Sequence, residues 1–141
     1  MIHYRNTDID LEAPFDLTEL TTILSGRGLM VLAAYLSEDG LWRATLEADY
    51  ELIDSKAHGQ EPERTTHALL SVVESLQGDA KELWNGCSRR VFDLGFDCGK
   101  EPWPLFCEVA PESLARIAAV GAELRITMYQ EIPLPPGRQK L

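Results

Sequence analysis

The strongest structural signal in this sequence is an unbroken apolar run at residues 29–36. The run is much shorter than the ~20 residues that a bilayer-spanning helix needs. It is typical of a β-strand that is buried on both faces or nearly so. Glu38, Asp39 and Gly40 then form a turn sequence, and residues 41–50 have the pattern of a second strand. These segments predict a β-hairpin.

Three other segments show the apolar spacing of helices that pack one face on a sheet. In the first, residues 16–25, Asp16 is the predicted N-cap and Glu19 completes a capping-box-like pair. Residues 63–77 carry the most regular apolar stripe, and a shorter helix is expected at residues 80–84. The last helix is expected at residues 111–121, with proline in its first turn and glycine at its end.

Period-two alternation predicts the remaining strands. Residues 1–9 predict an edge strand, residues 89–96 a core strand, and residues 122–129 a strand that alternates strictly. The expected inward set of that last strand is Ala122, Leu124, Ile126 and Met128, or the complementary face if both faces are covered.

The resulting order, β-α-β-β-α-β-α-β, predicts an α+β fold. We expect a two-layer sandwich with a ferredoxin-like core, in which helices cover one face of a mainly antiparallel sheet. The length of 141 residues indicates one domain. We assign it to residues 1–131 and treat residues 132–141 as a proline-rich C-terminal tail, because prolines cannot continue a β-ladder.

The formal charge of −10 is concentrated in the first half of the chain, where residues 1–61 hold twelve acids against four bases. Such a field repels nucleic acid and anionic lipid, and it attracts a basic protein. The alternative is that the charge serves solubility only. The N-terminus lacks the basic and then apolar pattern of a secretory signal, which predicts a cytoplasmic protein. No membrane association is expected.

Cysteines and histidines give no sign of a metal centre. Cys87, Cys98 and Cys107 are spaced by 11 and 9 residues, which fits neither a zinc knuckle nor a disulfide framework. The acids at positions 8, 10, 12 and 16 alternate, but they lack the glycine and the final glutamate of a calcium loop. We therefore expect no metal ligands and no cofactor.

The densest group of chemically versatile residues lies at positions 93–107. A thiol beside a lysine can be a nucleophile, and Asp97 with Glu101 can be an acid/base pair, but no histidine lies nearby in sequence to act as a base. Tryptophan is enriched among the residues that anchor interfaces. We take five residues of this loop as the candidate binding site: Asp97, Cys98, Glu101, Trp103 and Phe106.

Residues 92–103 and 114–129 resemble a group of small uncharacterised bacterial proteins. Those proteins share a G-[FY]-D-C-G-x-E-P-W loop and a C-terminal helix that is followed by a G-A-x-L-x-[IV]-T-x-Y strand. The resemblance extends over most of residues 8–131 and carries no established activity. It implies a stand-alone cytoplasmic α+β domain and, by analogy only, the company of the immunity proteins that bacteria make against their own toxins.

The leading hypothesis is a non-enzymatic protein-binding domain, most concretely an immunity-type inhibitor that covers a basic toxin surface. A second hypothesis is a small-molecule-binding or catalytic domain that uses Asp97, Cys98 and Glu101 in a pocket closed by Trp103. A third is a homo-oligomeric scaffold with an uncovered sheet face. The absence of a P-loop, a nucleophile elbow or a zincin motif favours the first hypothesis over the second.

Overall fold

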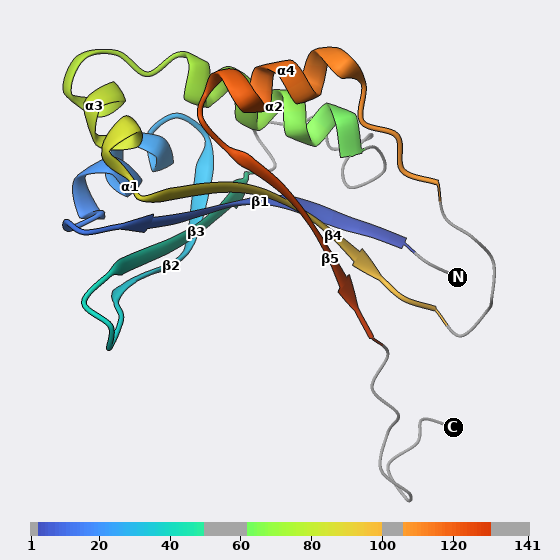
Figure 1. Cartoon of the computed structure of the whole chain (residues 1–141), viewed down its shortest axis with the longest axis horizontal. Helices are drawn as coiled ribbons and strands as arrows, with labels where there is room; N and C mark the ends of the chain where they lie inside the picture. The colour runs from blue at the N-terminus through green and yellow to red at the C-terminus, as the bar shows by residue number, and fades with distance from the viewer. Residues whose placement is uncertain (1–2, 50–61, 100–105, 131–141) are drawn as a thin grey trace, which may run out of the picture.

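A computed structural model describes residues 3–49, 62–99 and 106–130 and shows one five-stranded sheet with helices on one face (Figure 1). The strands are β1 (His3–Ala13), β2 (Leu29–Leu36), β3 (Trp42–Ala48), β4 (Arg89–Asp97) and β5 (Glu123–Tyr129). The helices are α1 (Thr18–Ser25), α2 (Pro62–Glu74), α3 (Gly78–Gly86) and α4 (Pro111–Ala119). The α+β sandwich that the sequence predicts is confirmed.

The strand order is β2-β3-β1-β4-β5, and every neighbouring pair is antiparallel except β4 and β5. Strands β1 and β2 are both antiparallel to β3, which lies between them, so α1 connects two parallel strands that a third strand separates. This is a split β-α-β arrangement. Strand β5 extends the sheet beyond β4.

The first strand differs from its sequence-based prediction. Residues 1–9 predicted an edge strand, but β1 is the central strand of the sheet and continues to Ala13. Its buried residues, Thr7, Ile9, Leu11 and Ala13, face the helices and alternate with charged residues that face the other side. The sequence-based prediction made this strand too short, because every second residue in its later part is acidic.

The second strand also differs from its prediction. Strand β2 does not lie buried on both faces but at the edge of the sheet, and five of its eight residues are exposed. The hairpin itself is confirmed: β2 pairs with β3 across a turn in which Gly40 has a φ of +85°. A glycine is favoured there because a side chain would be strained at a positive φ.

The core lies between the sheet and the helices and is built from aliphatic side chains around Phe92. Strands β1, β3 and β4 contribute alternate residues, and α1 and α2 contribute their apolar stripes. The largest fully buried members are Phe92, Ile9, Leu11, Leu17, Leu20, Leu24, Leu46, Leu69, Leu70 and Leu94.

Several helix termini differ in detail from the predicted ones, and α2 and α4 end two to three residues earlier than expected. Helix α1 begins at Thr18, and Leu17 rather than Asp16 occupies the N-cap position. The Asp16 carboxylate still accepts a hydrogen bond of 2.8 Å from the Thr18 backbone amide, but the predicted capping box with Glu19 is not formed. Helix α3 is longer than predicted and spans Gly78–Gly86.

Arg90 joins three parts of the fold at the start of β4. Its guanidinium donates hydrogen bonds of 2.8 to 3.1 Å to the backbone carbonyls of Trp84, Asn85 and Cys87 at the end of α3. It also donates to the carbonyl of Gly121, which has a φ of +72° in the turn before β5. One cation therefore caps the carbonyl groups at the end of α3 and holds this end of the helix beside the turn before β5.

Candidate functional site

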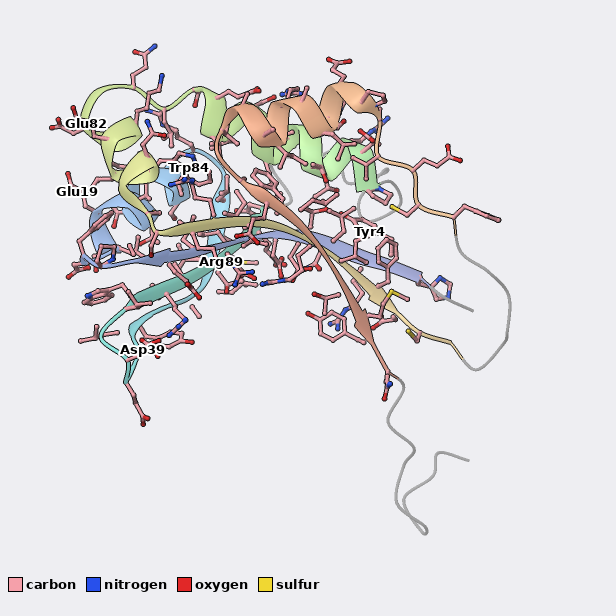
Figure 2. All side chains as sticks on the ribbon, viewed as in Figure 1. Tyr4, Glu19, Asp39, Glu82, Trp84 and Arg89 are labelled. Carbon is pink, nitrogen blue, oxygen red and sulfur yellow. The ribbon has the colours of Figure 1, made fainter. Side chains whose placement is uncertain are left out.

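The sheet face opposite the helices is not covered by any helix or strand of the described residues (Figure 1). Strand pairing places eleven charged residues on this face. We call it the open face. Figure 2 shows Arg89 on this side of the sheet and Trp84 on the helix side. Among the described residues its charged members are seven acids and four arginines: Asp8, Asp10, Glu12, Glu47, Asp93, Asp97 and Glu123, with Arg5, Arg43, Arg89 and Arg125.

Arg125 is the central cation of the open face. It projects from β5, pairs with Asp10 on β1 and donates to Asp93 on β4 at 2.8 and 3.0 Å. Thr127 adds hydrogen bonds of 2.7 and 2.9 Å to the same Asp93 carboxylate, and Thr45 donates to Asp10 at 2.7 Å. Strands β3, β1, β4 and β5 are thus connected by one polar network across their surface.

The other three arginines of the open face form separate ion pairs with nearby carboxylates. Arg43 lies 3.3 Å from Glu12 and 2.7 Å from Asp39 in the hairpin turn. Arg89 pairs with Glu123 at 3.0 Å. Arg5 lies 3.6 Å from Asp97, and its guanidinium stacks over the ring of Tyr129 at 4.7 Å. Five of the seven open-face acids therefore have an arginine partner.

A hollow of about 240 Å³ lies on the open face between these ion pairs. Its polar lining comes from Arg43, Arg89, Arg125, Asp10 and Glu12, and the exposed ring of Tyr35 forms part of its wall. The lining is mixed in charge, because each of its arginines already faces a carboxylate. It has the chemistry to accept a polar side chain or a small polar molecule.

Asp8 and Glu47 are the two acids of the open face that form no ion pair with any arginine or lysine of the described residues. They lie directly opposite each other on β1 and β3, and Asp8 also lies opposite Asp93 on β4. The Asn6 side-chain amide bridges the pair, donating to Asp8 at 3.1 Å and to Glu47 at 2.8 Å. A neutral amide thus holds two carboxylates together without neutralising them.

The electrostatic consequence falls on Asp8. Burial, as the main cause, and the neighbouring carboxylates of Glu47, Asp10 and Asp93 together raise the pKa of its carboxyl to about 7, and Arg5 lowers it only in part. Like charges directly opposite on adjacent strands are destabilising. The ionised form of Asp8 is therefore held at a cost in free energy at neutral pH.

The sequence-predicted site residues are only partly described by the structure. Asp97 ends β4 with a half-exposed side chain paired to Arg5. Cys98 follows it, and its backbone amide donates to the carbonyl of Tyr129 at 2.8 Å. Phe106 is 84% exposed. Glu101 and Trp103 lie outside the described residues.

The predicted nucleophile has no activating partner among the described residues. His3 lies opposite Asp97 in the β1–β4 ladder, but no hydrogen bond joins it to Cys98. The thiol of Cys87 is buried, which raises its pKa to about 11, and burial also raises the pKa of Cys107. Neither of these two thiols has the depressed pKa of a reactive cysteine.

The structure also shows a Glu63–His67–Ser113 cluster that sequence reasoning missed. His67 Nε2 lies 2.6 Å from Ser113 Oγ and 2.9 Å from Glu63 Oε2, and Ser113 Oγ donates to Glu63 Oε2 at 2.5 Å. A catalytic triad needs the acid and the hydroxyl on different nitrogens of the histidine. Here both contact the same nitrogen, and Ser113 is completely buried.

This cluster instead connects α2 to the start of α4. The other oxygen of Glu63 accepts the backbone amide of Ala110 at 2.6 Å, at the N-cap position of α4. Partial burial opposes ionisation of Glu63, but the hydrogen bonds from Ser113 and Ala110 outweigh it and lower the pKa of the carboxyl. An ionised acid at a helix N-terminus is favoured by the helix dipole.

The open face could have been found from one sequence pattern. The acids at positions 8, 10 and 12 alternate with Ile9, Leu11 and Ala13, as in a strand with one buried and one charged face. The contribution of Glu47 and Asp93 has no local signal, because strand pairing brings them to Asp8 from distant parts of the chain.

Comparisons with known proteins gave no match, whether with protein-family models, curated proteins or solved structures. Within the described residues no group of histidine, cysteine and acidic side chains has the arrangement of a metal site. None of the helices that the structure describes is long and apolar enough to cross a membrane.

Proposed function

We propose that this protein is a non-enzymatic binding domain whose open face binds a basic surface of another protein. Its most concrete form is an immunity-type inhibitor that covers a basic bacterial toxin. The proposal is carried by one observation: Asp8 and Glu47 lie opposite each other on the open face, and neither forms an ion pair with an arginine or lysine of the described residues.

The contrast with the rest of the face supports this proposal. The other five open-face acids each have an arginine within ion-pair distance. An arginine or lysine placed between Asp8 and Glu47 by a partner would remove the repulsion and add two charge-assisted hydrogen bonds. The free energy that the unbound protein loses at this position becomes part of the free energy of binding, as stability is commonly sacrificed at functional sites.

The surroundings of the carboxylate pair fit a protein partner. The hollow of about 240 Å³ on the same face offers space for one of the partner's side chains. The net negative charge of −10 accelerates encounter with a basic protein and orients it. Phe106, which is 84% exposed, supplies an apolar contact outside the open face.

The catalytic alternative has less support in the described residues. Asp97 is paired with Arg5, and neither His3 nor His67, the histidines that the structure describes, is hydrogen-bonded to Cys98. The Glu63–His67–Ser113 cluster keeps its hydroxyl completely buried. The resemblance to small bacterial proteins with an immunity-type context agrees with a binding role, but by analogy only.

Co-expression with the products of adjacent genes, followed by calorimetry on any complex obtained, tests the proposal. The decisive variant is the isosteric double substitution Asp8→Asn and Glu47→Gln. We expect it to weaken binding at least about tenfold, because charge pairs at interfaces couple by 1.5 kcal/mol or more. The matched control is Glu123→Gln, an open-face acid already paired with Arg89, which should change affinity little. Equal binding by wild type and the double variant would refute the proposal.

A further inference from the structure

Strand β2 has the composition of an interior strand and the position of an edge strand. None of its eight residues is charged, and Met30, Leu32, Tyr35 and Leu36 are 41 to 57% exposed. Its outer side pairs with no strand of the described residues. Edge strands normally carry lysines, prolines or inward-pointing charges that prevent pairing with another chain. Strand β2 has none of these protections except for one bulge.

We propose that β2 pairs antiparallel with β2 of a second copy of this chain, so that two sheets join into one of ten strands. The inference concerns the sheet edge and does not depend on the proposed function of the open face.

The bulge in β2 selects the register of this pairing. Leu32 has no partner in β3, because the pairing shifts between Val31 and Ala33. Met30 and Tyr35 consequently face the same side of the sheet, opposite Glu47 and Arg43. Val31 and Ala34 both face the helix side, opposite Leu46 and Ala44.

A two-fold axis between positions 32 and 33 therefore places residues of the same face opposite each other. Met30 meets Tyr35 of the second copy on the open-face side, and Val31 meets Ala34 on the helix side. A thioether beside an aromatic ring is a favourable contact, and aromatic and β-branched cross-strand pairs stabilise sheets. The bulge, which otherwise disrupts an edge, is matched by the identical bulge of the second strand.

Charges at the two ends of β2 complement each other in the same register. Arg27 precedes the strand and Glu38 follows it, so the antiparallel arrangement puts Arg27 of each copy beside Glu38 of the other. The β5 edge lacks this property. It carries two charged residues, Glu123 and Arg125, and Arg125 is paired with Asp10 and Asp93 on the open face.

The contact area of one strand pair is small. Interfaces below about 1,200 Å² are typical of weak and transient complexes, so we expect a dimer that dissociates in the micromolar range. Sedimentation velocity over a series of concentrations should show a reversible monomer–dimer equilibrium. If the protein sediments as a monomer at all concentrations up to about 1 mM, the proposal is overturned, because a specific interface of this size should form a dimer below that concentration.

Two sets of variants test the edge and the register. Leu32→Lys, at the unpaired bulge position, should raise the dissociation constant at least about tenfold, since it places two ammonium groups at the two-fold axis. The control is Ile126→Lys on β5, a residue 54% exposed, which should leave the equilibrium unchanged. Dimerisation that survives the first variant, or that the control abolishes, would place the interface elsewhere and overturn the proposal.

Charge reversal tests the register independently of the apolar contacts. Arg27→Glu and Glu38→Arg should each weaken the dimer, and the double variant should restore it to within about threefold of wild type. Arg27 also donates to Ser75 within the fold, so circular dichroism must show that each variant is folded. Two single variants without effect, or a double variant weaker than both, would refute the antiparallel register.

Discussion

Replacing Asp8 by asparagine should stabilise the free protein, because it removes a carboxyl group whose ionised form is unfavourable in the folded state. The carboxyl has a pKa of about 7 rather than the ordinary 3.8, which corresponds to roughly 4 kcal/mol at 1.36 kcal/mol per pKa unit. Solvent reduces this value because Asp8 is partly exposed. We therefore expect Asp8→Asn to raise the free energy of unfolding by about 2 kcal/mol at pH 8.

The sign of the pH dependence follows from the raised pKa. Between about pH 4 and pH 7 the folded protein binds a proton at Asp8 that the unfolded chain does not, so the wild type loses stability as the pH rises through this window. Above pH 7 the full cost is present, and below about pH 4 it is absent. The stabilisation by asparagine should therefore be complete at pH 8 and vanish near pH 4.

Urea denaturation of wild type and Asp8→Asn at several pH values measures this difference. Asn6 can still donate to the new side-chain oxygen, so the hydrogen bond is retained in the variant. The control is Glu123→Gln, an open-face acid whose carboxyl pKa is lowered by the hydrogen bond from Arg89, so this variant should not be stabilised at pH 8. A variant that is less stable than wild type at pH 8, or equally stabilised at pH 4 and pH 8, would refute the reasoning.

Three further outcomes follow from the fold. Arg90→Ala should lower the free energy of unfolding, measured by urea denaturation, by about 2 kcal/mol, because it removes the donors to four backbone carbonyls. A change below about 0.5 kcal/mol, the size of an ordinary surface substitution, would contradict this prediction. Phe92→Ala should cost about 4 kcal/mol in the same assay, since Phe92 is fully buried, and a loss of less than about 1 kcal/mol would be inconsistent with a packed core. Thiol labelling at pH 8 should modify Cys98 in the folded protein but Cys87 only on unfolding, because Cys87 is buried and its pKa is raised to about 11. Rapid labelling of Cys87 in the folded protein would show that α3 does not cover it.

Local sequence patterns were sufficient for most elements of the sandwich. The helix at residues 111–119 follows from its initial proline and apolar spacing, and the β2–β3 hairpin follows from its turn sequence. The order of the strands within the sheet was harder to predict from the sequence. Residues 1–9 and 29–36 exchanged their expected roles, because local alternation reports how a strand is patterned and not which strands flank it.

The candidate site depended on pairing between distant segments. Asp8 was recognised as part of an acidic cluster, but Glu47 and Asp93 reach it only through the β1–β3 and β1–β4 registers. The same holds for Glu63, His67 and Ser113, which come from α2 and α4. The loop at positions 93–107 attracted attention for its composition, yet Asp93 belongs to strand β4 and contributes to the open face instead.

The pKa of the Asp8 carboxyl, measured by NMR titration of its side-chain carbon, tests the central claim most directly. In the free protein we predict a value of about 7, because burial and the neighbouring carboxylates raise it and Asp8 forms no ion pair with an arginine or lysine of the described residues. On binding of a basic partner that inserts an arginine or lysine, the pKa should fall below about 4, the value of a paired carboxyl. A free-protein pKa close to the ordinary 3.8 would contradict the account, since it would show that this carboxylate is already stabilised without a partner.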